Sequence, residues 1–375
     1  MLRVVSSIIV AMAAIAGALD PLVLGLNGAL QRRVGLAKPL AVGSVNRASE
    51  SSSGVGGKGQ GAWVATQRLW RARGGPRPQL AQFYGTGDEG DALAAALRAA
   101  APGADEALWV RTAAATCICT TLVSPDGDAT EIVEPSGEVA PRECDALLAA
   151  LAGDGAAGGV LVMGSMPPGV PADFYARAVA ACVGDDGAAV LVDSVAGLAP
   201  LLAACAARGA SAVLKLNGRE LLALAGAPPV AGSDAAVACD AELVADAART
   251  VAAAHPAGAL GFVLWTDGPF PAGCLEIASG RRWALKLPPL PGPVLSPIGA
   301  GDAVAGGTFS YWLKHADEGA AAAAADAPPL VVQAFGFGLA CGAASCLTAE
   351  NSVFELETVD ALHAELKCEE LSASV

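Results

Sequence analysis

The segment Pro297-Ile-Gly-Ala-Gly-Asp302 is a glycine-rich turn that opens directly into a helical pattern, which is expected to end near Lys314. Its small residues leave the backbone N–H groups of Gly299, Ala300 and Gly301 uncovered, and the start of a helix adds positive dipole character there. Together these groups predict an anion hole. Asp302 stands at its mouth and could take a proton from a hydroxyl nucleophile during phosphoryl transfer. The helix dipole alone would also favour an Asp here, so further motifs must decide.

A second motif, Lys215-Leu-Asn217-Gly-Arg-Glu220, directly follows an apolar strand. Asn217 and Glu220 are three residues apart, so both can face a ligand at the end of that strand. A carboxylate there can hold Mg²⁺ through water, which suits a nucleoside triphosphate. The same spacing is also a helix capping box, and that alternative stays open.

A third segment, Gly54 to Gly61, contains five glycines with Lys58 among them. It includes the G-x-G-x-x-G pattern of dinucleotide-binding proteins, but residues 44–53 are polar and do not predict the buried strand that this motif needs. An NAD-dependent oxidoreductase is therefore disfavoured. Lys58 is followed by Gly59 rather than Ser or Thr, which excludes a Walker A loop. The loop can still hold a sugar or a phosphate.

The elements that must position these motifs alternate along the chain. Apolar strands are expected at 159–163, 188–192, 212–216 and 261–265, and helices at 171–183, 197–208 and 218–225. Strands separated by helices predict an α/β fold with a mostly parallel sheet covered on both faces. Ligands bind such sheets outside the carboxyl ends of the strands. Loops after residues 26, 163, 216 and 265 and the turn at 299 would meet there, and bring Ser165, Thr266 and Gly268 to one site.

Residues 112–135 have a different pattern. The runs 120–123 and 129–133 flank Pro125-Asp126-Gly127, which predicts a β-hairpin. A hairpin inserted in an α/β chain can form a lid over a site, or it can be an edge hairpin with no active role.

Composition excludes several classes of protein. The 375 residues are 54% hydrophobic, enough for one large core, and the formal net charge is −14 without any Lys/Arg-rich run. Nucleic-acid binding is therefore disfavoured, and Lys58 and Lys215 are the cations to watch. The ten cysteines form no C-x-x-C pair and there are only three histidines, so no zinc ligand set is evident and reduced thiols are expected.

The N-terminal segment 1–20 combines Arg3, an apolar run from Val4 to Leu19 and a small-residue exit. This predicts a signal or organelle-targeting segment, for example to a plastid, while a first core element of a cytoplasmic protein is the alternative. No later apolar run is long enough to span a membrane without interruption. A single domain is expected over 21–366, with lid strands within about 27–50 and 112–135, and residues 367–375 are expected to be a frayed polar tail.

The order of these motifs resembles the PfkB/ribokinase family of carbohydrate kinases, and most closely its 1-phosphofructokinase and tagatose-6-phosphate kinase subgroup. The resemblance covers about residues 22–360. It is carried by G-G-K-G near residue 57, G-S-M-P-P-G at 164, K-x-N-x-x-E at 215, T-x-G at 266 and G-A-G-D at 299. The segment 25–31 is similar to the subgroup's N-P-A-x-D opening.

The resemblance implies a three-layer α/β/α core with a small β lid, and transfer of phosphate from ATP with Mg²⁺ to a sugar or sugar phosphate. Asp302 would be the general base beside the anion hole of residues 299–301. Asn217 and Glu220 would organise Mg²⁺ and phosphate, with Glu220 as the metal residue. The nucleotide would lie along Lys215, Thr266 and Gly268, and the acceptor would face Asn27, Gln31, Gly57, Lys58, Gly59 and Ser165.

The sequence departs from the family pattern on the acceptor side. The opening motif's Asp is Gln31, an expected Asn is Gly61, and the lid's Arg-x-Asn is Cys117-Ile-Cys119. The Asp-Thr that usually precedes G-A-G-D is Ser296-Pro297. A thiol cannot replace a bidentate Arg, so a fructose-like sugar phosphate is a doubtful substrate.

These departures leave a second function open. The chain could be a catalytically inactive kinase-like scaffold or regulatory protein that binds nucleotide or a partner protein. Retention of Asp302 and Glu220 favours the enzyme. The exposed edge of the lid hairpin could also pair two subunits as a homodimer.

Overall fold

The computed structural model describes residues 20–75, 77–125, 129–154, 156–184, 188–227, 238–322 and 327–372. The predicted targeting segment therefore lies outside the described residues, apart from Asp20, and so does most of the predicted hairpin turn at 125–127.

A ten-stranded sheet forms the centre of the molecule, in the order β14-β13-β12-β11-β10-β9-β8-β1-β4-β5. Every pairing from β5 to β11 is parallel, and β12, β13 and β14 add antiparallel strands at one edge. This confirms the predicted mostly parallel α/β architecture. The strands are β1 (Leu22–Asn27), β4 (Gln79–Gly85), β5 (Trp109–Thr112), β8 (Gly159–Met163), β9 (Ala189–Asp193), β10 (Ala212–Asn217), β11 (Leu260–Asp267), β12 (Phe270–Glu276), β13 (Arg282–Lys286) and β14 (Lys367–Leu371).

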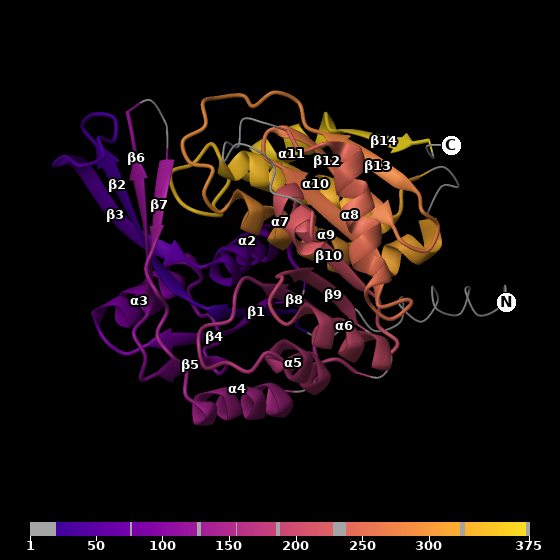
Figure 1. Cartoon of the computed structure of the whole chain (residues 1–375), viewed down its shortest axis with the longest axis horizontal. Coiled ribbons are helices and arrows are strands. Elements are labelled where there is room, and N and C mark those ends of the chain that lie inside the picture. Colours follow the sequence, from indigo (N-terminus) through magenta and orange to yellow (C-terminus); the bar gives the residue numbers. More distant parts are fainter. Residues whose placement is uncertain are drawn as a thin grey trace.

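Helices cover both faces of this sheet (Figure 1). One face is packed by α4 (Pro141–Asp154), α5 (Phe174–Cys182), α6 (Leu198–Ala207), α7 (Gly218–Leu224) and α8 (Ala241–Ala253). The other face is packed by α2 (Lys58–Arg73), α3 (Asp88–Ala100), α9 (Ala300–Ala322) and α10 (Leu330–Ser345), with α11 (Leu356–Ala364) outside α10.

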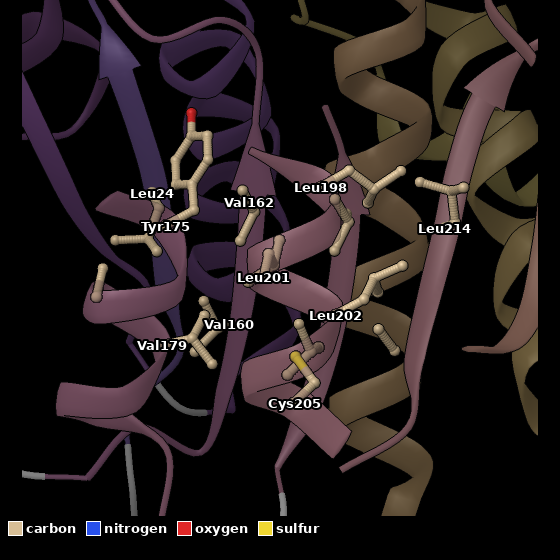
Figure 2. Close-up of a cluster of buried hydrophobic side chains, with 14 of the residues drawn as sticks. Leu24, Val160, Val162, Tyr175, Val179, Leu198, Leu201, Leu202, Cys205 and Leu214 are labelled. Atoms are coloured by element: carbon tan, nitrogen blue, oxygen red, sulfur yellow. The ribbon is translucent and has the colours of Figure 1, made fainter. Parts of the chain in front are cut away.

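Strand alternation divides the buried side chains between the two layers. Leu24 and Val162 point toward α5 and α6, whereas Val23 and Leu161 belong to the cluster under α2 and α9. Figure 2 shows the first cluster, in which side chains of α5 and α6 lie over β1, β8 and β10. Because these strands are buried on both faces, they are almost continuously apolar, which is what made them recognisable in the sequence.

A second, four-stranded sheet projects from the carboxyl side of the large sheet, at the upper left of Figure 1. It has the order β3-β2-β6-β7 and is called the lid below. Its strands are β2 (Ala29–Leu36), β3 (Ala48–Gly56), β6 (Cys117–Val123) and β7 (Ala129–Val133). The antiparallel pair β6–β7 is the hairpin expected from the sequence.

Three sequence expectations differ from the structure. The polar residues before Gly57 do form a strand, β3, which is exposed because it belongs to the lid rather than the core. The helix expected to end near Lys314 continues to Ala322. The expected frayed tail contains β14, which pairs with β13 and is fixed there by the Arg281–Glu370 ion pair at 2.7 Å. A polar edge strand carries no apolar pattern, so composition could not reveal it.

Among the described residues, no helix combines the length and apolar character that crossing a membrane requires.

The start of α2 lies directly on β1 at a contact between two glycines. A Cβ added to Gly59 would lie 2.1 Å from the Cα of Gly25, and one added to Gly25 would lie 2.7 Å from the Cα of Gly59. Any side chain at either position therefore pushes the helix off the sheet.

We expect Gly59→Ala to lower the free energy of unfolding by about 1–3 kcal/mol, because overpacking against a backbone cannot be relieved by a rotamer change. Gly54→Ala is the matched control, since a Cβ there meets no atom within 4 Å. Urea denaturation of the three proteins measures the effect. Equal stability of the two variants would contradict the expectation.

Candidate active site

One cleft of about 1280 Å³ lies between the carboxyl ends of the parallel strands and the lid. It is lined by all of the residues that the sequence predicts for the site. They are Asn27, Gln31, Gly57, Lys58, Gly59, Ser165, Lys215, Asn217, Glu220, Thr266, Gly268, Gly299, Ala300, Gly301 and Asp302. The motifs that are far apart in the sequence therefore meet in one space, as the loop-convergence argument expected.

Asp302 lies in the first turn of α9, on the floor of this cleft. The first N–H groups of a helix have no partner inside the helix, so they remain available to an anion. Gly299 takes a φ of +81°, which a residue with a side chain rarely adopts, and this bend aims the turn at the cleft. The Ala300 N–H already donates to the Pro297 carbonyl at 3.3 Å. The N–H groups of Gly299 and Gly301 are therefore the better donors to a bound anion.

Ser352 supports the turn from behind. It is fully buried, it has a φ of 58°, and its hydroxyl donates to the Gly299 carbonyl at 3.1 Å. The sequence analysis missed this residue, because a serine beyond a helix carries no motif of its own.

A buried ion pair holds the start of α9 against the sheet. Lys215 Nζ lies 2.6 Å from Asp193 Oδ2 and donates to the Gly301 carbonyl at 3.0 Å. Both side chains are almost fully buried, so each charge depends on the other. Asp193 was also missed in the sequence. Its only sign is a polar residue at the end of the apolar strand β9.

Asn217 and Glu220 form the capping box that the sequence left open. The Asn217 amide oxygen accepts from Glu220 N–H at 2.8 Å, and Glu220 Oε2 accepts from Asn217 N–H at 3.0 Å. Glu220 also keeps a second oxygen, Oε1, which accepts from Lys58 Nζ at 3.1 Å. The capping box therefore holds the Glu220 carboxylate at the cleft through Oε2, while Oε1 stays outside the box.

Lys58 links the two sides of the cleft. Its ammonium group lies 3.1 Å from Glu220 and 3.7 Å from Asp193. Burial alone would lower the pKa of Lys58, but the Asp193, Glu220 and Asp302 carboxylates outweigh burial and raise it. Lys58 is therefore charged at all physiological pH values.

The Asp302 carboxyl has an altered acidity. Burial raises the pKa of Asp302 to about 8, the Asp193 carboxylate adds to the increase, and Lys58 and Lys215 oppose it. In the free protein near neutral pH this carboxyl is therefore largely protonated. A cation or a hydroxyl donor that enters the cleft would favour its ionised form.

Gly61 explains one departure from the family pattern. A Cβ at this position would lie 2.8 Å from Asp302 Oδ2 and 2.7 Å from the Ser352 hydroxyl. Because Gly61 has no side chain, the Asp302 carboxylate has room beside it.

Amides, hydroxyls and thiols line the cleft where the lid meets the end of β1. Asn27 donates to the Ser165 hydroxyl at 3.0 Å and accepts from the Ser136 hydroxyl at 2.9 Å, while Gln31 donates to Thr121 at 2.8 Å. Cys117 and Cys119 line the same space as free thiols. Ser136 is a further residue that no sequence motif indicated.

Comparison with known proteins agrees with this geometry. The family model of the pfkB family carbohydrate kinases matches residues 29–349. The chain belongs to this family. Its members are sugar kinases, which transfer a phosphoryl group to an alcohol, so this protein is a phosphotransferase of that class. No curated protein sequence matches the chain.

Solved structures show the same fold at low sequence identity. Phosphofructokinase-2 from Escherichia coli in complex with fructose-6-phosphate is 20% identical, with a TM-score of 0.68 over 92% of this chain and 99% of that one. Ribokinase from Giardia lamblia is 18% identical, with a TM-score of 0.67 over the same shares. A protein from Thermotoga maritima described as a possible 1-phosphofructokinase is 18% identical, with a TM-score of 0.64 over 94% and 100%. The ribokinase-like fold is thereby confirmed.

We expect Gly61→Ala to lower kcat/KM by about a hundredfold, because a displacement of about 1 Å at a reacting group can cost that much. The added methyl group must displace the Asp302 carboxylate or Ser352. Gly153→Ala, in the exposed part of α4 where a Cβ meets no atom within 4 Å, is the control. Full activity of Gly61→Ala would show that the position of Asp302 is not critical.

Proposed function

We propose that this protein is an ATP- and Mg²⁺-dependent carbohydrate kinase in which Asp302 is the general base. The observation that carries the proposal is the position of Asp302. It lies in the first turn of α9, beside uncovered N–H groups and within the electrostatic reach of Lys58 and Lys215. A base, an anion hole and two cations in one cleft are the parts that phosphoryl transfer to a hydroxyl group requires.

The residues present fit a nucleotide with Mg²⁺. Mg²⁺ in such sites uses one or two carboxylates together with phosphate oxygens and waters, and Glu220 Oε1 faces the cleft for this purpose. Bound Mg²⁺ would neutralise phosphate charge. Among the described residues no group of three ligands that could hold a metal by itself is found, which agrees with a metal that arrives with ATP.

The part of the cleft below Thr266 and Gly268 suits a nucleoside. The cleft lining includes apolar side chains from the elements that follow these residues in the chain, among them Phe270 of β12, Leu285 of β13 and Leu339 of α10. A purine ring would bury its faces there, and the triphosphate would extend toward the start of α9. Lys215 fixes that helix start, and Lys58 would pair with phosphate oxygens in place of Glu220.

In the reaction Asp302 would accept the proton of the acceptor hydroxyl as the hydroxyl oxygen bonds to the terminal phosphorus of ATP, while the bond from that phosphorus to the bridging oxygen breaks and ADP leaves. The N–H groups at the turn of Gly299 and Gly301 stabilise the charge on the transferring phosphoryl group. Positioning and charge neutralisation supply most of the rate enhancement.

We expect Asp302→Asn to lose turnover by about a hundredfold or more, since removing a general base costs roughly 10²–10⁴. ADP production with a panel of sugars and sugar phosphates measures this. A variant that retains most of its activity would remove Asp302 from the mechanism.

The Asp302→Asn variant should also be at least as stable as the parent at pH 7. With a folded pKa of about 8, the Asp302 carboxyl of the parent keeps a proton that the unfolded chain releases above about pH 4, so the parent loses stability as the pH rises from about 4 to 8. The Asn variant has no such loss.

We expect kcat/KM of the parent to rise with pH and to level off above about 8, because only the ionised Asp302 can accept a proton. The profile is measured with Mg-ATP and acceptor both well below saturation, so that it reports the free protein, over roughly 3.5 pH units from pH 6 to pH 9.5. A flat profile through this range would contradict the assignment of the raised pKa to the catalytic base.

A further inference from the structure

Two of the ten free thiols lie next to each other on the lid and face the cleft. Cys117 and Cys119 both belong to β6, and both line the cleft. Residues two apart on a strand point to the same face of the sheet. The two sulfur atoms are close enough to share a hydrogen bond. The proposed phosphoryl transfer uses neither thiol.

The strand register orders the other side chains of this lid face in rows. Cys119 shares its row with Gln31 of β2 and Val133 of β7. The next row is made of Arg33 from β2, Thr121 from β6 and Glu131 from β7. Paired residues point to the same face of a sheet. The thiols therefore lie on a face that carries charge of both signs one row beyond Cys119.

The two thiols differ in acidity because one donates to the other. A hydrogen bond from Cys119 lowers the pKa of the Cys117 thiol to about 7. Burial opposes this decrease, a hydrogen bond with Ser136 adds to it, and the Glu134 and Glu131 carboxylates oppose it. The bond to Cys117 and burial both raise the pKa of Cys119. Near neutral pH a large share of Cys117 is therefore thiolate, while Cys119 keeps its proton.

This division of roles suits oxidation by a peroxide. The thiolate is the reactive form of cysteine, and redox-sensitive cysteines combine a low pKa with a second thiol beside them. A third thiol of the cleft lacks these features. Cys346 follows the end of α10, and burial raises its pKa. Access to the cleft alone therefore does not make a thiol of this protein reactive.

We propose that Cys117 and Cys119 form a peroxide-sensitive dithiol, in which Cys117 is oxidised first and Cys119 is the resolving thiol. In the first step the Cys117 sulfur bonds to one oxygen of hydrogen peroxide and the O–O bond breaks. The other oxygen leaves as hydroxide, which takes up a proton to become water, and Cys117 is a sulfenic acid.

In the second step the Cys119 sulfur bonds to the Cys117 sulfur and the S–O bond breaks. The hydroxyl group leaves as water with the proton of Cys119. Overall, two electrons pass from the two thiols to the peroxide, and the product is a disulfide within β6. The proposal does not depend on the kinase function.

The disulfide would bend β6. Residues two apart on an extended strand have Cα atoms roughly 6.6 Å apart, near the long end of the range of about 4.4–6.8 Å that a disulfide spans. The strand must therefore pucker at Ile118 to bring the two Cβ atoms together. This weakens the pairing of β6 with β2 and β7, so the shape of the lid depends on the oxidation state. A strained disulfide is also easily reduced, which makes the change reversible.

The test follows the thiols of the full chain by mass spectrometry. Reduced protein is treated with hydrogen peroxide at pH 7, the remaining thiols are alkylated, and the protein is digested with trypsin. Both thiols lie in the peptide 112–142, since cleavage follows Arg111 and Arg142. We expect this peptide to lose two hydrogen atoms and to resist alkylation, and dithiothreitol to restore it. A peptide that stays reduced would overturn the proposal.

Cys346 and Cys368 are the matched controls. Cys346 lines the same cleft and Cys368 is exposed, and burial raises the pKa of both thiols. We expect Cys117 to be oxidised about tenfold faster than either control, because a much smaller share of each control is thiolate. Oxidation of a control at the rate of Cys117 would show that the pair has no special reactivity and would overturn the proposal.

The variant Cys119→Ser separates the two steps. The serine hydroxyl can still donate to Cys117, but it cannot form a disulfide. Cys117 should then remain a sulfenic acid that dimedone traps, whereas the parent should give little of this adduct. Equal labelling of parent and variant would exclude Cys119 as the resolving thiol. The mass change of the parent decides the proposal if the variant does not fold.

Hydrogen exchange tests the effect on the lid. We expect the amides of β6 and β7 to exchange faster in the oxidised protein, while those of β8 in the large sheet exchange equally in both forms. Equal exchange of β6 after the disulfide has formed would overturn the link between oxidation and the shape of the lid.

Discussion

The buried ion pair between Lys215 and Asp193 is the interaction on which the cleft depends. Three carboxylates, those of Asp193, Glu220 and Asp302, lie close enough that each affects the pKa of Lys58. Burial and the Asp193 carboxylate raise the pKa of Asp302 to about 8, and Lys58 and Lys215 limit that increase. Lys215 neutralises Asp193 and at the same time holds the Gly301 carbonyl, so one side chain both balances charge and fixes the start of α9. The geometry of the anion hole thus follows from an electrostatic requirement.

Most of the core could be read from the sequence because its elements are dictated locally. The strand expected at 159–163 is β8 with the same bounds. The helix expected at 197–208 is α6, shorter by one residue at each end, and the helix expected at 218–225 is α7, shorter by one residue at its C-terminal end. Strands buried on both faces must be apolar along their whole length, which gives them a clear pattern. The expected helix at 171–183 begins later, at Phe174, since Pro171 to Asp173 form a turn before it.

The site could be predicted only where chemistry requires a run of neighbouring residues. The turn at Gly299 and the pair Asn217 and Glu220 are such runs. Asp193 and Ser352 act through contacts with residues that are far away in sequence, so a single sequence gave no indication of them. The same holds for Gly61, whose lack of a side chain has meaning only once Asp302 is seen beside it. Loss of the expected Asn is thus compatible with an undisturbed Asp302 carboxyl group.

Two of the four connections between the lid and the core are single residues. Only Gly28 separates β1 from β2, and only Gly57 separates β3 from α2. The residues on the core side of these hinges are Asn27 and Lys58, which both line the cleft. A rotation of the lid at Gly28 and Gly57 would therefore act directly on both residues. A ligand that shifts the lid would therefore also act on Lys58 and on its contacts with Glu220 and Asp193.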